Sequence, residues 1–139
     1  MNIRSQLIAL VVSSISFLLL GSSWQCTTGQ NVHPPIDADS AWVIVTERVL
    51  QDFGTKVRIY VSQKPIGKEE KIKAVETEYA IPETFTSAWL FFVDDAPDAN
   101  WEHPCRYILV DTVSGNTHVI EGKLPPDDLD QMKKIHPAN

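Results

Sequence analysis

An unbroken apolar run at residues 89–93 constrains the fold of this chain more than any other feature. The run reads Trp89, Leu90, Phe91, Phe92 and Val93, and no polar residue interrupts it. A strand with one face in water alternates apolar and polar residues, because successive side chains point to opposite faces of the sheet. Residues 87–95 are therefore predicted to form a central strand that is covered on both faces.

Two β-hairpins are predicted on either side of this strand. Residues 105–122 read as strand, turn and strand, with Gly115 of the turn VSGN at a position that favours positive φ. Residues 41–63 read as the other hairpin. Its first half, AWVIVTERVL, is rich in β-branched and aromatic residues, and its second half alternates apolar and polar side chains.

Residues 68–79 are ambiguous between strand and helix. Ile72, Val75 and Tyr79 fit the stripe of an amphipathic helix, and Glu69 and Lys73 form a favourable i,i+4 pair. The valine, threonine and tyrosine of the second half are typical of a strand, and strand is the slightly favoured prediction.

A short C-terminal helix is predicted after the prolines at 125 and 126. Asp127 can cap this helix, whose acidic residues lie near its start and whose lysines lie near its end. Leu129, Met132 and Ile135 could dock on the sheet. The predicted fold is thus α+β or mostly β. It is a small antiparallel sheet of five to six strands with one short C-terminal helix.

The N-terminus has the pattern of a secretory signal peptide. A single basic residue, Arg4, precedes an uncharged apolar stretch at 7–20, and small residues follow up to Ser23. Residues 1–23 are predicted to be removed on export, which leaves an extended arm at 24–40 and one β-rich domain at 41–139. An uncleaved membrane anchor is the alternative, although the stretch is shorter than the roughly 20 residues that span a bilayer.

Cys26 and Cys105 are the two cysteines of the chain. In an exported protein an even count favours a disulfide, which would fasten the arm to the start of a strand. Lipidation of Cys26 would instead tie the protein to a membrane, but Trp24 and Gln25 depart from the small residues that precede a lipidated cysteine.

The charge excludes one large class of partner. The chain has 12 basic and 18 acidic residues and a net charge of −6. A nucleic-acid binder needs a basic surface to neutralise phosphates, so no nucleic-acid partner is predicted.

Residues 94–107 are the densest concentration of reactive side chains. They form the predicted connection between two strands, and loops held by a scaffold often carry function. The candidate binding residues are Asp94, Asp95, Asp98, Trp101, Glu102 and His103. They could bind a partner, or they could serve the architecture alone, with Trp101 packing the loop and His103 bonded to the backbone.

Metal and catalytic interpretations of the same segment are weaker. Its carboxylates suit Ca²⁺, but the spacing of an EF-hand is absent, so no metal or cofactor is predicted. A nucleophilic Cys105 would need a base within hydrogen-bond reach, and His103 is the nearest candidate. The tryptophans at 42 and 89 are assigned to the core.

The hairpin at 105–122 resembles PepSY-type exported domains in its Val110-Asp111 end and its Ser-Gly-Asn turn at 114–116. The resemblance implies a small α+β module that binds or inhibits peptidases, as a free domain or a propeptide. Such domains place a long amphipathic helix before the sheet, and no such helix is predicted here.

The leading functional prediction is a secreted or periplasmic, non-catalytic domain that binds a protein or a surface ligand. The alternatives are a small extracytoplasmic hydrolase or metal-dependent enzyme that uses residues 94–107, and a structural envelope protein held by its N-terminus.

Overall fold

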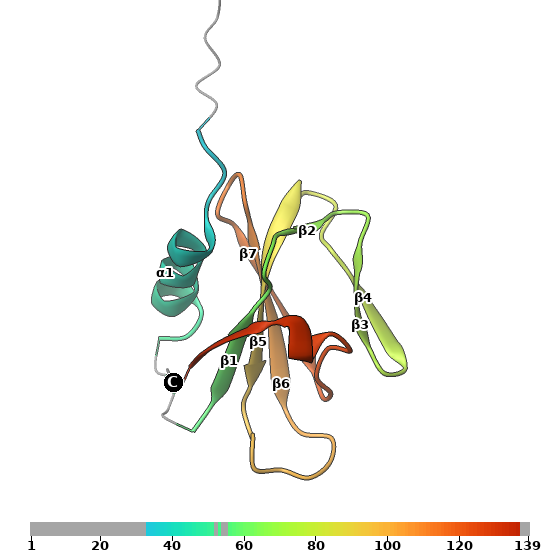
Figure 1. Ribbon diagram of the computed structural model, residues 1–139. Coiled ribbons are helices and arrows are strands. Elements are labelled where there is room, and N and C mark those ends of the chain that lie inside the picture. Colours follow the sequence, from blue (N-terminus) through green and yellow to red (C-terminus); the bar gives the residue numbers. More distant parts are fainter. Residues whose placement is uncertain (1–32, 52, 54–55, 137–139) are drawn as a thin grey trace, which may run out of the picture. The chain divides into compact units, whose positions relative to one another are not determined.

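A single antiparallel sheet organises the computed structural model, which describes residues 33–51, 53 and 56–136. Its strand order is β7-β6-β5-β1-β8, and the short β2 pairs with β5 on the same edge as β1. The elements are α1 (Ala38–Arg48), β1 (Arg58–Val61), β2 (Ile66–Gly67), β3 (Lys71–Ala74), β4 (Thr77–Ala80), β5 (Ser87–Asp94), β6 (Cys105–Asp111), β7 (Thr117–Gly122), the 3₁₀ turn η1 (Leu129–Gln131) and β8 (Lys133–His136). Helix α1 lies on one face of the sheet and the β3–β4 hairpin on the other (Figure 1).

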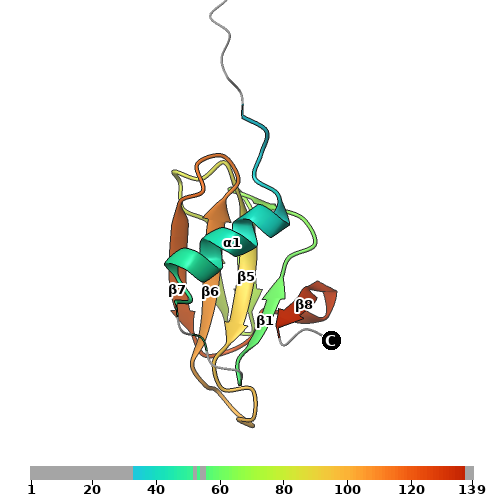
Figure 2. The same cartoon turned by 90° about the vertical axis from the view of Figure 1, so that its left-hand side faces the viewer.

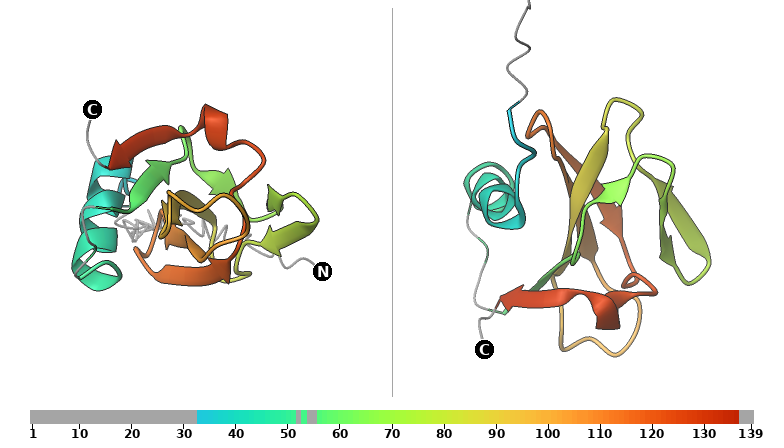
Figure 3. Two further views of the ribbon diagram at one scale, coloured as in Figure 1. Left: turned by 90° about the horizontal axis from the view of Figure 1, so that it is seen from below. Right: turned by 45° about the horizontal axis from the view of Figure 1, so that its top comes forward.

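The central strand is β5, and its two faces are both covered, as predicted. Phe91 packs in a core that includes Ala41 and Val45 of α1. Phe92, on the opposite face, packs in a second core with Ile72 of β3. Both phenylalanines are at most 1% exposed. The views in Figure 3 show the two covering layers on opposite sides of the sheet.

The prediction of a strand at 41–50 is wrong, because these residues form most of α1. Asp37 caps the helix by accepting a hydrogen bond from the Ser40 backbone N–H at 2.7 Å. Ala41 and Val45, one turn apart, are completely buried against the sheet. Burial of this stripe outweighs the modest helix propensity of the β-branched residues. The helix lies across the sheet in Figure 2, and the hairpin predicted at 41–63 does not form.

The hairpin at 105–122 is confirmed as β6 and β7. The two strands pair from Cys105 with Gly122 to Val110 with Thr117. Gly115 has a φ of +68°, as the turn signal predicts.

Residues 68–79 are largely extended, in agreement with the favoured prediction. Strands β3 and β4 form a separate two-stranded sheet in which Lys71 pairs with Ala80 and Ala74 with Thr77. Val75, at the turn, has a φ of 47°, and its N–H donates to Asp127 Oδ1 at 2.7 Å. This bond ties the tip of the hairpin to the C-terminal segment.

The predicted C-terminal helix is wrong, since only η1 is helical and the chain then continues as β8. Met132 is extended, and β8 pairs with β1 through Tyr60 and Lys134. The pairing supplies β8 with backbone hydrogen bonds that a helix would otherwise have to provide. The α-helix of the described residues therefore precedes the sheet and does not follow it.

The predicted signal peptide, nearly all of the predicted arm and Cys26 lie outside the described residues. Within the part of the chain that is described, no helix has the length and apolar character needed to cross a membrane.

Candidate functional site

The predicted binding segment is a loop, residues 95–104, that joins β5 to β6 and is called the β5–β6 loop below. Its two ends are held together because Asp94, the last residue of β5, pairs with Cys105, the first residue of β6. The loop therefore projects from the central strand β5 and its neighbour β6 (Figure 1).

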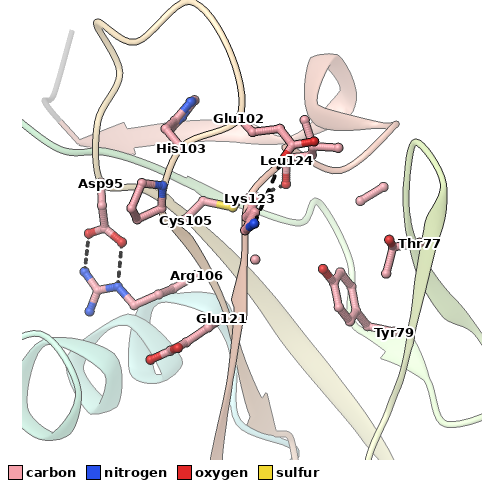
Figure 4. A pocket seen from close by; sticks show the side chains of 13 residues that line it. Thr77, Tyr79, Asp95, Glu102, His103, Cys105, Arg106, Glu121, Lys123 and Leu124 are labelled. Atoms are coloured by element: carbon pink, nitrogen blue, oxygen red, sulfur yellow. Dashed lines mark hydrogen bonds and ion pairs between the residues drawn. The ribbon is translucent and has the colours of Figure 1, made fainter.

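Asp95 and Arg106 fasten the start of the loop to β6. The Arg106 guanidinium donates from Nε to Asp95 Oδ2 at 2.8 Å and from Nη2 to Oδ1 at 2.5 Å. Both side chains are about three-quarters buried, at 28% and 25% exposed. This two-pronged geometry, drawn in Figure 4, fixes the direction of both planar groups.

His103 fastens the end of the loop. Its Nδ1 lies 2.7 Å from the Trp101 carbonyl oxygen, and its Nε2 lies 2.9 Å from Asp94 Oδ1. When both ring nitrogens donate, one to the Trp101 carbonyl and the other to the Asp94 carboxylate, the imidazole carries a positive charge. The bond to the Trp101 carbonyl and, after it, the bond and charge of Asp94 raise the pKa of His103 against the opposing effect of burial.

The remaining predicted residues lie on the surface of the loop. Trp101 is 87% exposed. The Asp98 carboxylate lies 4.0 Å from the Arg58 guanidinium, and the Glu102 carboxylate lies 4.0 Å from the Lys123 ammonium. Both acidic side chains are exposed. The six predicted residues thus divide into an inner set that holds the loop and an outer set that faces solvent. The outer set is Asp98, Trp101 and Glu102.

A groove of about 860 Å³ adjoins the loop. One wall is the β3–β4 hairpin, through Thr77 and Tyr79. The other is formed by Glu121 of β7 and by Lys123, which follows that strand (Figure 4). Glu102 and His103 of the loop close one end. Sequence reasoning missed the hairpin and β7 residues, and no local pattern marks them, because they meet only when the hairpin folds over the sheet.

Cys105 lines the same groove but is only 2% exposed. Its Sγ donates to the Leu124 carbonyl at 3.3 Å. Burial, and then the charges of Asp94 and Asp95, raise the pKa of the thiol to about 11. The thiolate that a nucleophile requires is therefore scarce at neutral pH. His103 is hydrogen-bonded to Asp94 and Trp101, so it does not act as a base for this thiol.

No disulfide is formed among the described residues, in which Cys105 is a free buried cysteine. Its predicted partner, Cys26, lies outside the described residues. Pairing of the two therefore stays a prediction.

Within residues 33–51, 53 and 56–136, no group of three or more histidine, cysteine or acidic side chains is arranged to hold a metal ion.

Comparison with protein-family models, curated proteins and solved structures gives no match to this chain. Its function must therefore be inferred from the chemistry of its own residues.

Proposed function

We propose that this protein is a non-catalytic binding domain that works outside the cytoplasm and holds a partner protein against the β5–β6 loop. The observation that carries the proposal is the 87% exposure of Trp101 on a loop whose two ends are fastened by ion pairs. Tryptophan is among the residues that contribute most to protein interfaces.

Burial of the Trp101 indole supplies enough binding free energy for an anchor residue. Burying about 200 Å² of an indole at about 25 cal/mol per Å² stabilises a complex by about 5 kcal/mol before the entropic cost of association. The pairs Asp95–Arg106 and Asp94–His103 order the loop in advance. Less entropy is then lost on binding, and more of the indole's contribution remains as affinity.

The exposed acids select the kind of partner. Asp98 is 91% and Glu102 64% exposed at the side chain, and both flank Trp101. Charges at the rim of an interface chiefly steer the two proteins toward each other as they meet by diffusion. We therefore propose a partner surface that has an apolar recess surrounded by basic groups.

The engagement of His103 and Cys105 supports a non-catalytic role. Both nitrogens of His103 are hydrogen-bonded, and the raised pKa of Cys105 keeps its thiol protonated. A general base needs a free acceptor atom, and a thiol nucleophile needs its ionised form.

Site-specific photo-crosslinking tests the binding surface. A benzophenone amino acid is placed at position 101 in the cells that make the protein, and at position 113 as a control. Val113 is 66% exposed and follows the far end of β6. We expect a discrete protein adduct from position 101 that is missing from position 113. No adduct at 101, or the same adducts at both positions, would contradict the proposal.

Export is tested separately by mass spectrometry of the mature protein. We expect a mass that lacks about the first 23 residues, in keeping with the signal-peptide pattern. An intact Met1 contradicts cleavage, whereas a lipid mass on Cys26 favours attachment to a membrane.

A further inference from the structure

A second cavity lies on the helix-covered face of the sheet, away from the β5–β6 loop. It measures about 520 Å³, within the range of sites that bind small molecules. Its walls include Trp42 of α1 and Trp89 and Phe91 of β5, and we call it the tryptophan pocket. Sequence reasoning assigned both tryptophans to the core, but each is only partly buried.

The aromatic walls are held in fixed orientations. The Trp89 indole N–H donates to the Ile36 carbonyl at 2.8 Å. Trp42 stacks on Phe91 with ring centroids 6.0 Å apart and meets Phe53 edge-on at the same distance. The pocket therefore presents rigid, flat apolar surfaces that a ligand need not order on binding.

The rim of the tryptophan pocket is polar and electrically balanced. It carries the carboxylate of Asp39, the amide of Gln63 and the ammonium of Lys133. Within the described part of the chain, neither Asp39 nor Lys133 takes part in an ion pair. Gln63 donates to the Gln131 carbonyl at 2.7 Å, which leaves its side-chain oxygen as an acceptor.

This combination selects a neutral ligand that has one apolar face and several hydroxyl groups. A cation would be attracted by Asp39 but repelled by Lys133, an anion would meet the reverse, and a purely apolar ligand would leave the rim groups unused, so the rim favours no net charge. A sugar ring satisfies all three conditions, since its C–H face can pack on an indole while its hydroxyls both donate and accept. We propose that the tryptophan pocket binds a sugar ring of a neutral glycan.

The proposal is tested by titrating the purified full-length protein with maltotriose, cellotriose and tri-N-acetylchitotriose. Indole N–H signals in ¹H–¹⁵N NMR spectra report on each tryptophan separately. We expect at least one sugar to shift the signals of Trp42 and Trp89 in a saturable way, with Trp101 unmoved. Tetramethylammonium and acetate serve as charged probes and are expected to cause no saturable shift.

Two rim variants, Asp39→Ala and Lys133→Ala, test the polar contacts. Each removes an exposed side chain without an intramolecular partner among the described residues, and each should weaken sugar binding about two- to tenfold, as for one lost hydrogen bond. Lys68→Ala is the matched control, because Lys68 is exposed and does not line the pocket. It should bind like the unmodified protein.

Three results would overturn the proposal. The first is the absence of any saturable shift up to about 20 mM sugar, well above a weak millimolar affinity. The second is a response to a charged probe alone. The third is sugar binding that moves only Trp101, or that both rim variants leave unchanged. None of these results depends on the crosslinking test at position 101, so the two proposals can fail separately.

Discussion

Replacing Asp111 should destabilise the protein more than its position beside a surface turn would suggest. Asp111 is 3% exposed, and its carboxylate accepts three hydrogen bonds. Oδ1 accepts from the Thr86 N–H at 3.0 Å, and Oδ2 accepts from the N–H and the hydroxyl of Ser114, both at 2.7 Å. These bonds join the start of β5 to the turn between β6 and β7.

The magnitude follows from what Asp111→Ala leaves behind. Each hydrogen bond to a charged acceptor contributes about 1.5 kcal/mol or more to stability. The Asp111→Ala variant regains part of this loss, because it has no carboxylate that must be desolvated on folding. Two backbone N–H groups, of Thr86 and Ser114, lose their acceptor. We expect the free energy of unfolding to fall by about 3 kcal/mol. Asp111→Asn keeps the Thr86 bond and should cost about half as much.

Urea denaturation of the full-length protein, followed by tryptophan fluorescence, measures this effect. With an m-value of about 1.5 kcal/mol per M, the midpoint of Asp111→Ala should fall by about 2 M. Asp130→Ala is the control, because Asp130 is an exposed aspartate in η1. A loss below about 1 kcal/mol for Asp111→Ala would refute the assigned role of the three bonds.

The same carboxylate predicts an acid dependence. Burial alone would raise the pKa of Asp111, but the hydrogen bonds from Ser114 and Thr86 together lower it below its ordinary value of 3.8. A group whose pKa is lower in the folded protein than in the unfolded chain stabilises the fold at any pH above its pKa in the unfolded chain. This stabilisation is lost as the pH falls through the pKa of the folded protein. The deficit of Asp111→Ala should therefore be constant near neutral pH and shrink below pH 3.8.

Three further predictions concern the candidate site. The pKa of His103 is raised, so the stability it contributes is complete below pH 6.5 and is lost as the pH rises through the folded pKa. An NMR titration of its ring protons should show this raised pKa, and Asp94→Asn should lower it. Gly122→Ala would place a Cβ 2.7 Å from the ring of Tyr107, and the midpoint of urea unfolding should reveal a loss of about 1–3 kcal/mol. Where Cys105 is unpaired, it should react with a thiol reagent at pH 8 far more slowly in the native protein than in urea, because it is buried and its pKa is about 11.

The central strand and the hairpin after it could be predicted because their signals are local. The run at 89–93 has no polar residue, and the turn at Gly115 needs a positive φ whatever surrounds it. Helix α1 could not be predicted from propensity, since its β-branched residues favour a strand. It is helical because the sheet buries Ala41 and Val45, which lie one turn apart, and all described strands of that sheet come later in the chain.

The C-terminal segment differs from its predicted structure for the opposite reason. Its order of acids and then lysines suits a helix, but the exposed edge of β1 offers backbone hydrogen bonds that extend the sheet. Asp94 and His103 could be predicted as parts of one candidate site because they are near each other in the sequence. The groove walls at Tyr79 and Lys123 could not, because only the packed hairpin brings them together.

One small domain can carry the two proposed sites because they lie on different elements. The first is the exposed Trp101 on the β5–β6 loop, and the second is the tryptophan pocket, which is lined by residues of α1, β1, β5 and β8. Asp98, Trp101 and Glu102 do not line the tryptophan pocket. Binding free energies at sites without shared partners add with little coupling. A protein held at Trp101 and a sugar held at Trp89 would therefore occupy the domain independently, so the domain could join a glycan surface to a partner protein.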